Sequence, residues 1–200
     1  FIYFSFIRIF YAPNNNLTGS IPKEFGNING LQVVVLSNNK IEGALPVELK
    51  NLSELEDFII DNNLIGFTNR QEKSASSTSQ TTENIRYIPD ELSNLIALNR
   101  INIDNNQLMF NDIEPIFSWD AYNNLEEFVY YPQNIIGTEK TETAQENKKF
   151  EILIDNYYPG PSDKYQWYKN GTKITGATSA KLEFAVVKPE DAGEYYCKVS

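Results

Sequence analysis

A repeat of 24 residues constrains the fold of this chain more than any other feature of its sequence. The pattern LxxLxLxxNxL, with apolar residues at the L positions, occurs three times in register. Its copies are Ile7, Phe10, Ala12, Asn15 and Leu17; Leu31, Val34, Leu36, Asn39 and Ile41; and Leu55, Phe58, Ile60, Asn63 and Ile65. Because one such unit cannot bury its apolar face alone, copies in register predict a solenoid of stacked coils.

A fourth copy follows after an insertion. It comprises Leu98, Ile101, Ile103, Asn106 and Leu108 and begins 43 residues beyond the third copy, which is one period plus 19 residues. The extra residues fall within 67–86, a stretch rich in Ser, Thr and Gln with hardly any large apolar side chains. A segment of this composition cannot form a packed core, so we predict a disordered insertion that leaves the solenoid at 67–86.

The segments that follow the repeats share a Gly and Pro signature. They read LTGSIPKEFGN from Leu17, IEGALP from Ile41 and IPDELSNL from Ile88. This signature resembles the plant-type leucine-rich repeat, LxGxIPxxLxxLxxL. The resemblance implies an α/β-type solenoid with short parallel strands on one side and irregular or 3-10 segments on the convex side. It also implies a structural role for Asn15, Asn39, Asn63 and Asn106, whose side chains would hydrogen-bond the backbone of neighbouring coils.

The repeat pattern decays after Leu108. Leu125, Phe128 and Tyr130 have the spacing of one more strand, and Gln133 stands where the pattern has Asn. We expect residues 111–132 to form a terminal coil, because the end of a solenoid must cover its exposed apolar face. Residues 1–11 are strongly apolar but too few to span a bilayer, so we assign them to the first repeat and the whole array to residues 1–134.

A different pattern occupies residues 135–200. Alternating apolar residues at 150–154 predict a strand, and the aromatic segment 165–169 is followed by Asn-Gly, a hairpin signal. The sequence DAGEYYC at 191–197 resembles the DxGxYxC signature of immunoglobulin-like domains. The resemblance implies an all-β sandwich, with Trp167 as its core Trp and Tyr195 at the tyrosine-corner position.

The chain departs from that family in two respects. Cys197 is its only cysteine, and Ile152 or Ile154 stands where the disulfide partner belongs, so we expect a small buried thiol beside Trp167. The chain also stops at Ser200, so we expect a fragment whose sandwich lacks its last strand. Plant-type repeats beside a cysteine-poor immunoglobulin-like domain resemble bacterial multidomain surface proteins.

Composition excludes much of enzyme chemistry. Histidine is absent, which removes the commonest general base and the usual zinc ligand, and no phosphate-binding Gly-rich loop, GxSxG or HExxH motif occurs. The carboxylates of Asp57, Asp61, Asp104, Asp112 and Glu114 lack the spacing of a calcium loop. We therefore predict no enzyme, no cofactor and no metal. A net charge of −10 also argues against nucleic acid, and no segment is long enough for a membrane span.

The outward positions of the predicted strands form the candidate binding face. In LxxLxL the residues between the apolar ones point away from the core. They are Val35, Ser37, Ile59, Asp61, Asn102, Asp104, Val129 and Tyr131. Residues 1–137 contain 8 basic and 17 acidic residues, so the face is predicted to be apolar and acidic and to suit a protein or peptide with basic groups, or a glycan. The alternative is a solvated face with no ligand.

Three functions fit these features. The first is a non-catalytic extracellular or cell-surface module for protein binding, adhesion or recognition. The second is the ectodomain of a leucine-rich-repeat signalling receptor, and the third is an accessory binding region of a large secreted enzyme. Asn16, Asn51 and Asn170 begin N-glycosylation sequons, which matter only in a eukaryotic secretory pathway. The ligand and the oligomeric state stay open.

Overall fold

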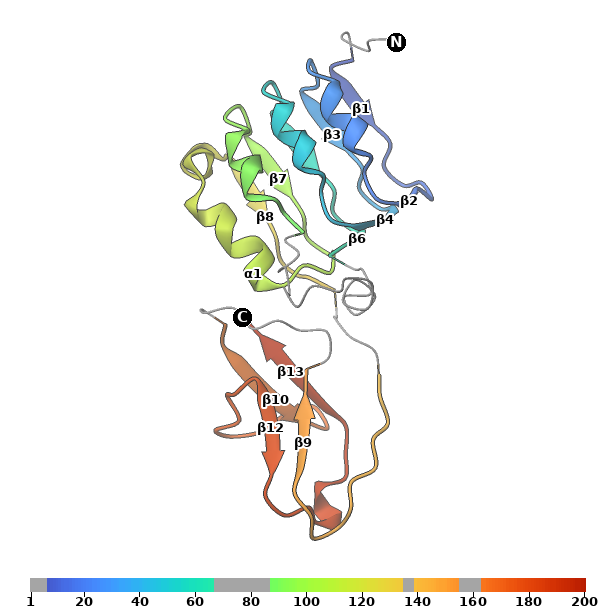
Figure 1. The fold of residues 1–200 in the computed structure, drawn as a ribbon, viewed down its shortest axis with the longest axis vertical. Coiled ribbons are helices and arrows are strands. Elements are labelled where there is room, and N and C mark those ends of the chain that lie inside the picture. Colours follow the sequence, from blue (N-terminus) through green and yellow to red (C-terminus); the bar gives the residue numbers. More distant parts are fainter. Residues whose placement is uncertain (1–6, 67–86, 135–138, 155–162) are drawn as a thin grey trace, which may run out of the picture. The chain divides into compact units, whose positions relative to one another are not determined.

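The chain divides into two compact units, residues 1–135 and 136–200, in the computed structural model. The structure describes residues 7–66, 87–134, 139–154 and 163–200. The predicted disordered insertion at 67–86 lies outside the described residues, as do residues 1–6. Each unit has its own sheets and its own buried side chains, and each is described by itself (Figure 1).

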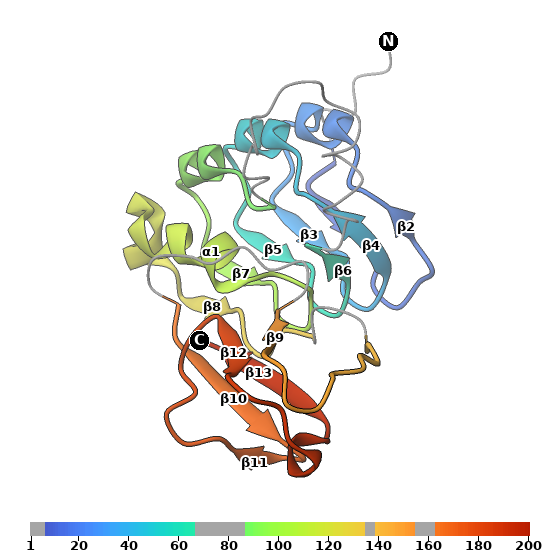
Figure 2. The ribbon, with the colours of Figure 1, turned by 60° about the horizontal axis from the view of Figure 1, so that its bottom comes forward.

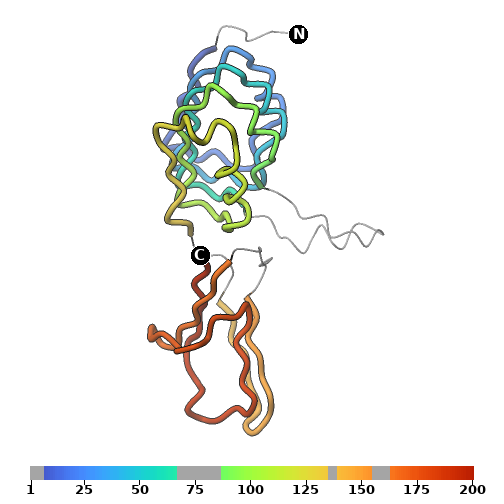
Figure 3. The backbone as a smooth tube through the Cα atoms, turned by 90° about the vertical axis from the view of Figure 1, so that its left-hand side faces the viewer, coloured from blue at the N-terminus to red at the C-terminus, as the bar shows by residue number. Residues whose placement is uncertain are grey.

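Unit 1 is built on a five-stranded parallel sheet, as the repeat predicted. The strands follow one another in chain order: β1 (Ile9–Tyr11), β3 (Val33–Val35), β5 (Asp57–Ile59), β7 (Arg100–Asn102) and β8 (Glu127–Val129). The middle residues of the strands pair across the sheet, from Phe10 through Val34, Phe58 and Ile101 to Phe128. The insertion therefore leaves the register unchanged, and the coils stack on one another (Figure 3).

Short 3-10 helices lie on the other side of the coils (Figure 2). They are η1 (Lys23–Asn27), η2 (Val47–Asn51), η3 (Asp90–Asn94) and, in the last coil, η5 (Asp120–Asn124). The first three begin directly after Pro22, Pro46 and Pro89, which are extended with φ of −66°, −71° and −62°. Proline fixes φ near these values and donates no backbone hydrogen bond, so it starts each helix at the same point of the coil.

A second, smaller parallel sheet follows the turn of each coil and was not expected from the sequence. It contains β2 (Thr18–Gly19), β4 (Lys40–Gly43) and β6 (Leu64–Ile65). The glycines at its end, Gly19, Gly43 and Gly66, have φ of +76°, +83° and +95°. Side chains disfavour this conformation, which explains why the repeat has Gly there.

Alanine at Gly66 is expected to destabilise unit 1 more than alanine at Gly43. Both substitutions require a side chain at positive φ, which costs about 1–2 kcal/mol. At Gly66 a Cβ atom would also collide with the backbone carbonyl of Gln107, whereas at Gly43 the nearest atom is the Ser20 Cβ at 3.6 Å. Urea unfolding of Gly66→Ala and Gly43→Ala measures the difference. Equal midpoints would show that the contact with Gln107 does not constrain the coil.

The array ends in a coil that covers its core. α1 (Phe110–Ile113) and η4 (Glu114–Ser118) precede η5 and β8. Ile113, Ile116 and Trp119 are buried against the preceding coils. Phe117 packs edge-on against three aromatic rings, those of Tyr122, Phe128 and Tyr130, with ring centroids 5.3–5.7 Å apart. An aromatic cluster thus closes this end without cysteines.

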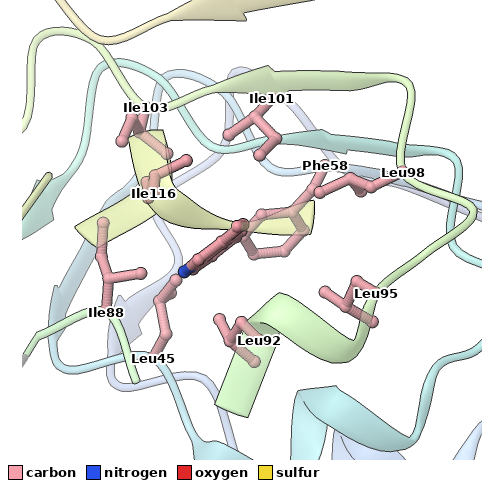
Figure 4. Close-up of a pocket in the computed structure, with 10 residues that line it drawn as sticks. Leu45, Phe58, Ile88, Leu92, Leu95, Leu98, Ile101, Ile103 and Ile116 are labelled. Atoms are coloured by element: carbon pink, nitrogen blue, oxygen red, sulfur yellow. The ribbon is translucent and has the colours of Figure 1, made fainter. Parts of the chain in front are cut away.

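The described part of unit 1 contains a small void in its core. Apolar side chains from successive coils, among them Leu45, Phe58, Ile101 and Ile116, converge on a void of about 20 Å³ (Figure 4). This is room for one water molecule at most, and an apolar lining does not retain one. The void is therefore a packing gap.

Unit 2 contains two small antiparallel sheets. One has the order β11-β10-β13 and the other pairs β12 with β9. Their bounds are β9 (Phe150–Leu153), β10 (Tyr165–Lys169), β11 (Thr172–Lys173), β12 (Lys181–Phe184) and β13 (Tyr195–Val199), with η6 (Pro189–Asp191) before β13. Asn170 and Gly171 join β10 to β11 with φ of +48° and +76°, as a hairpin turn with positive φ at both central residues requires.

The thiol of Cys197 is more exposed than the sequence suggested. Cys197 pairs with Trp167 across β10 and β13, but Trp167 is only 2% exposed whereas Cys197 is half-buried. Among the described residues β13 has a neighbour on one side only, so solvent reaches the other edge. Partial burial still raises the pKa of the Cys197 thiol above its ordinary value, which keeps the sulfur protonated and unreactive at neutral pH.

Candidate binding face of the repeat array

The Asn of each repeat joins neighbouring coils behind the strands of the candidate face. The Asn39 amide donates to the Leu36 carbonyl oxygen of its own coil and to the Ala12 carbonyl oxygen of the preceding coil, both at 2.9 Å. Its carbonyl oxygen accepts from the Leu17 N–H at 3.0 Å. Asn63 and Asn106 repeat this pattern one coil further along each time. The bonds fix the spacing of successive strands.

The hydrogen bonds from these Asn side chains to neighbouring coils form a ladder, and its two ends differ from its middle. Asn15 is exposed and donates only within its own coil, to the carbonyl oxygens of Ala12 and Pro13. At the other end Gln133 takes the Asn position, donating to the Ile103 carbonyl oxygen at 2.9 Å and accepting from the Leu108 N–H at 3.2 Å. The longer Gln side chain therefore completes the ladder in the last coil.

A second Asn of each repeat was missed by the sequence analysis. Asn14, Asn38, Asn62 and Asn105 have φ between +49° and +57° and directly precede the ladder residues. Among residues with a side chain, Asn adopts this left-handed conformation most readily. The signal was available, because every copy of the repeat contains Asn-Asn.

The strand register brings four of the predicted face residues into one row. Val35, Ile59, Asn102 and Val129 stand opposite one another in β3, β5, β7 and β8. Tyr11 of β1 extends this row and is 70% exposed, although the sequence analysis did not include it. The row is apolar except at Asn102, and it forms the centre of the candidate face.

The predicted residues beyond the strand ends differ in exposure. Tyr131 is 78% exposed, whereas Ser37 is only 8% exposed. Its hydroxyl donates to the Asp61 carboxylate at 2.5 Å, which turns Ser37 towards the next coil. Asp61 also accepts from the Asn62 amide at 2.6 Å. Ser37 therefore supports Asp61 and offers little surface to a ligand.

A neighbouring row contains an ion pair that the sequence did not reveal. Asp57 and Arg100 face each other in β5 and β7, and the guanidinium binds the carboxylate through two hydrogen bonds, one of 2.8 Å from Nε. This bond and the charge of Asp57 raise the pKa of Arg100. Asp57 is almost fully buried, and the Arg100 guanidinium compensates its negative charge within the sheet. The remaining acidic charge of the face comes from Asp61, Asp104 and the exposed Glu56, Glu126 and Glu127.

Comparisons with known proteins agree with this geometry at the level of the repeat. Residues 30–52 match the Leucine Rich Repeat family model. Human pro-neuregulin-2, membrane-bound isoform, is 30% identical over 70 residues, covering 30% of this chain and 8% of that protein.

Two solved structures resemble the chain over a similar range. They are a Leptospira interrogans LRR protein (24% identity, TM-score 0.45, 61% of this chain and 25% of that one) and the LRR ectodomain of the receptor kinase SOBIR1 from Arabidopsis thaliana (20% identity, TM-score 0.43, 63% and 56%). The chain therefore spans only part of the proteins it resembles. Unit 1 has a solenoid fold of the leucine-rich-repeat type. That conclusion rests on the matched repeat and on the parallel sheet, one strand per repeat.

The candidate face presents apolar side chains and carboxylates. Among residues 7–66, 87–134, 139–154 and 163–200, no three Asp, Glu or Cys side chains are grouped so that they could hold a metal ion. In the same residues no helix has the length and apolarity needed to cross a membrane. The carboxylates of Asp61 and Asp104 are separate acceptors on successive coils, which suits them to hydrogen bonds with a cationic ligand.

The pKa of the Asp104 carboxyl is raised above its ordinary value. Partial burial is the main cause, the charge of Asp61 adds to it, and a hydrogen bond from Asn105 acts in the opposite direction. One carboxylate oxygen of Asp104 is buried with no hydrogen-bond partner among the described residues. Ionisation of Asp104 in the folded chain therefore costs free energy, and a bound cation would lower this cost.

Replacing Asp104 with Asn is expected to stabilise the solenoid at neutral pH. Because the folded chain protonates Asp104 at a higher pH than the unfolded chain, wild-type stability from this group is present at acidic pH and is lost as pH rises through the raised pKa. Asn cannot ionise, so the gain in free energy of unfolding should vanish at acidic pH. At neutral pH it should lie below about 1 kcal/mol, as for most partly exposed substitutions. Thermal unfolding at both pH values measures it, with the exposed Asp120→Asn as control. A gain that is largest at acidic pH would contradict the burial argument.

Proposed function

We propose that the chain is a non-catalytic extracellular binding module whose solenoid face binds a protein or peptide carrying apolar and basic groups. The observation that carries this proposal is the apolar row of Tyr11, Val35, Ile59 and Val129 beside the carboxylates of Asp61 and Asp104. Repeat solenoids commonly bind ligands on the surface formed by their strands. An apolar centre provides binding energy, while carboxylates favour a partner of opposite charge.

Substituting Ile59 and Asp61 together tests this function. Full-length chain carrying Ile59→Ser and Asp61→Asn should capture less partner from the native surroundings than wild type does, and the purified partner should bind it about tenfold or more weakly in a titration. Serine and Asn are chosen because they remove the apolar contact and the charge while Asn can still accept from the Ser37 hydroxyl.

A matched control separates loss of the face from loss of charge or apolar surface in general. Ile96 is largely exposed and Glu91 is exposed on η3, on the opposite side of the coils. Ile96→Ser with Glu91→Gln makes equivalent changes there and should leave capture unchanged. If both double variants capture the partner as wild type does, the face is not the binding site.

We also propose that residues 136–200 are an immunoglobulin-like domain. The Tyr195 hydroxyl donates to the Asp191 carbonyl oxygen four residues upstream, which is the tyrosine-corner hydrogen bond of that class. Trp167 lies opposite Cys197 in the paired strands, where the family has its core Trp beside a cysteine. Similarly, the glycine-ended strands β2, β4 and β6 support assignment of the solenoid to the plant-type repeat class.

An extracellular or surface location is part of the same proposal. The human relative is described as a membrane-bound isoform, and immunoglobulin-like sandwiches recur in cell-surface domains. Adhesion or recognition at a surface is therefore our first hypothesis. A receptor ectodomain or an accessory region of a secreted enzyme would use the same face, so the full-length gene distinguishes them.

A further inference from the structure

One face of the three-stranded sheet in unit 2 presents tyrosine and lysine side chains together. Tyr168 of β10 pairs with Tyr196 of β13 and with Lys173 of β11, and Gln166 pairs with Lys198. Side chains alternate along a strand, so these residues share one face while Trp167 belongs to the other. We call Lys173, Tyr168, Tyr196 and Lys198 the tyrosine–lysine platform. Tyr196 is 43% exposed, and both lysines are exposed.

The two tyrosine rings of the platform pack against each other. They stack with centroids 4.9 Å apart and planes 5° apart, and the Lys198 ammonium lies 5.3 Å from the Tyr168 ring centroid. Rigid tyrosines lose little conformational entropy on binding, which is one reason why they are common at protein interfaces. Stacking covers one face of each ring, and Tyr196 remains 43% exposed, so the platform still offers aromatic surface and hydroxyl groups to a partner.

The platform is positively charged and its charge is not compensated locally. In the part of the chain that the structure describes, neither Lys173 nor Lys198 forms an ion pair with a carboxylate. The lysines of the other sheet differ, because Lys181 and Lys149 pair with Glu151 and Glu183. Two ammonium groups without a carboxylate partner among the described residues therefore lie on the face that also exposes the stacked tyrosines.

We propose that the tyrosine–lysine platform is a docking surface for an acidic peptide segment of a partner protein. Carboxylates of such a segment would accept hydrogen bonds from the two ammonium groups and the tyrosine hydroxyls, while its apolar side chains would contact the ring edges. The two ammonium groups, which lack a carboxylate partner among the described residues, favour an acidic segment over a neutral ligand. This site is separate from the solenoid face, which favours a basic partner.

A titration with a defined acidic peptide tests the proposal. The probe is a fluorescein-labelled peptide of Glu and Leu. Its affinity for the full chain is measured by fluorescence anisotropy at about 0.15 M salt. Wild type should bind it, and should bind the counterpart with Gln in place of Glu more weakly. Lys173→Glu with Lys198→Glu should weaken binding of the acidic peptide at least about tenfold. Tyr168→Phe with Tyr196→Phe, which retains the stacked rings, should weaken it about threefold.

Matched charge reversals elsewhere in unit 2 decide between docking and general electrostatics. Lys148 and Lys188 are exposed, and Lys148→Glu with Lys188→Glu changes the net charge by the same amount. This variant should bind the acidic peptide within about twofold of wild type. Equal weakening by the two charge reversals would overturn the proposal, as would failure of wild type to bind the acidic peptide. Binding of a heparin oligosaccharide in place of the peptide, abolished by the platform variants, would assign the surface to a glycan instead.

Discussion

Replacing Asn106 with Leu is expected to lower the stability of the solenoid by about 4 kcal/mol, because several buried backbone groups lose their partners at once. The Asn106 amide donates to the carbonyl oxygens of Ile60 and Ile103 at 3.0 and 3.1 Å, and its own oxygen accepts from the Ile65 N–H at 2.9 Å. Leu is likewise branched at Cγ, but it can neither donate nor accept a hydrogen bond. Since most domains have only about 5–15 kcal/mol of stability, the loss should be visible in any unfolding experiment.

The two ends of the ladder provide the controls. Asn15→Leu affects an exposed side chain that bonds only within its own coil, so it should cost less than about 1 kcal/mol. Asn106→Gln should cost less than Asn106→Leu, because Gln133 makes the corresponding bonds in the last coil. Urea unfolding followed by the fluorescence of Trp119, in a Trp167→Phe background, reports on unit 1 alone. A midpoint for Asn106→Leu no lower than that for Asn15→Leu would show that the ladder contributes little.

The repeat made the core and the strands of unit 1 predictable. A fixed period sets which residues face inwards, so Leu31, Val34 and Leu36 are buried as their positions in the pattern predicted. The register also survives the insertion, because each coil pairs with its neighbour through the same three strand positions. A repeat pattern specifies the features that all coils share, such as the buried positions and the strand register. These shared features were predictable from the sequence.

Features that depend on two particular side chains were not predictable in this way. Asp57 and Arg100 are 43 residues apart, and position 100 carries no recurring residue, so nothing in the pattern indicated their ion pair. Ser37 is buried for a related reason, since its hydroxyl binds the carboxylate that Asp61 contributes from the next coil. The electrostatics of the face are set by such pairs, so the sequence indicated an acidic face without showing which carboxylates stay available.

In unit 2, replacing Trp167 with Ala is expected to have the largest effect. Trp167 is 2% exposed, and its indole N–H donates to the Ser179 carbonyl oxygen at 2.9 Å. Loss of a buried Trp costs about 3–5 kcal/mol. Because a unit of this size buries a small core, a loss of that order removes most of its stability. Unit 2 should then unfold while the Trp119 fluorescence of unit 1 keeps its native spectrum.

Trypsin measures this unfolding directly, since Lys169, Lys173 and Lys181 lie in strands β10, β11 and β12 and are cleaved once the strands open. Trp167→Ala should be cut there much faster than wild type. Trp167→Phe keeps an aromatic ring but loses the bond to Ser179, so its cleavage should be intermediate. Leu153→Ala removes a side chain that is mostly exposed and should be cut at the wild-type rate. If Trp167→Ala resists trypsin as wild type does, the stability of unit 2 does not depend on this core.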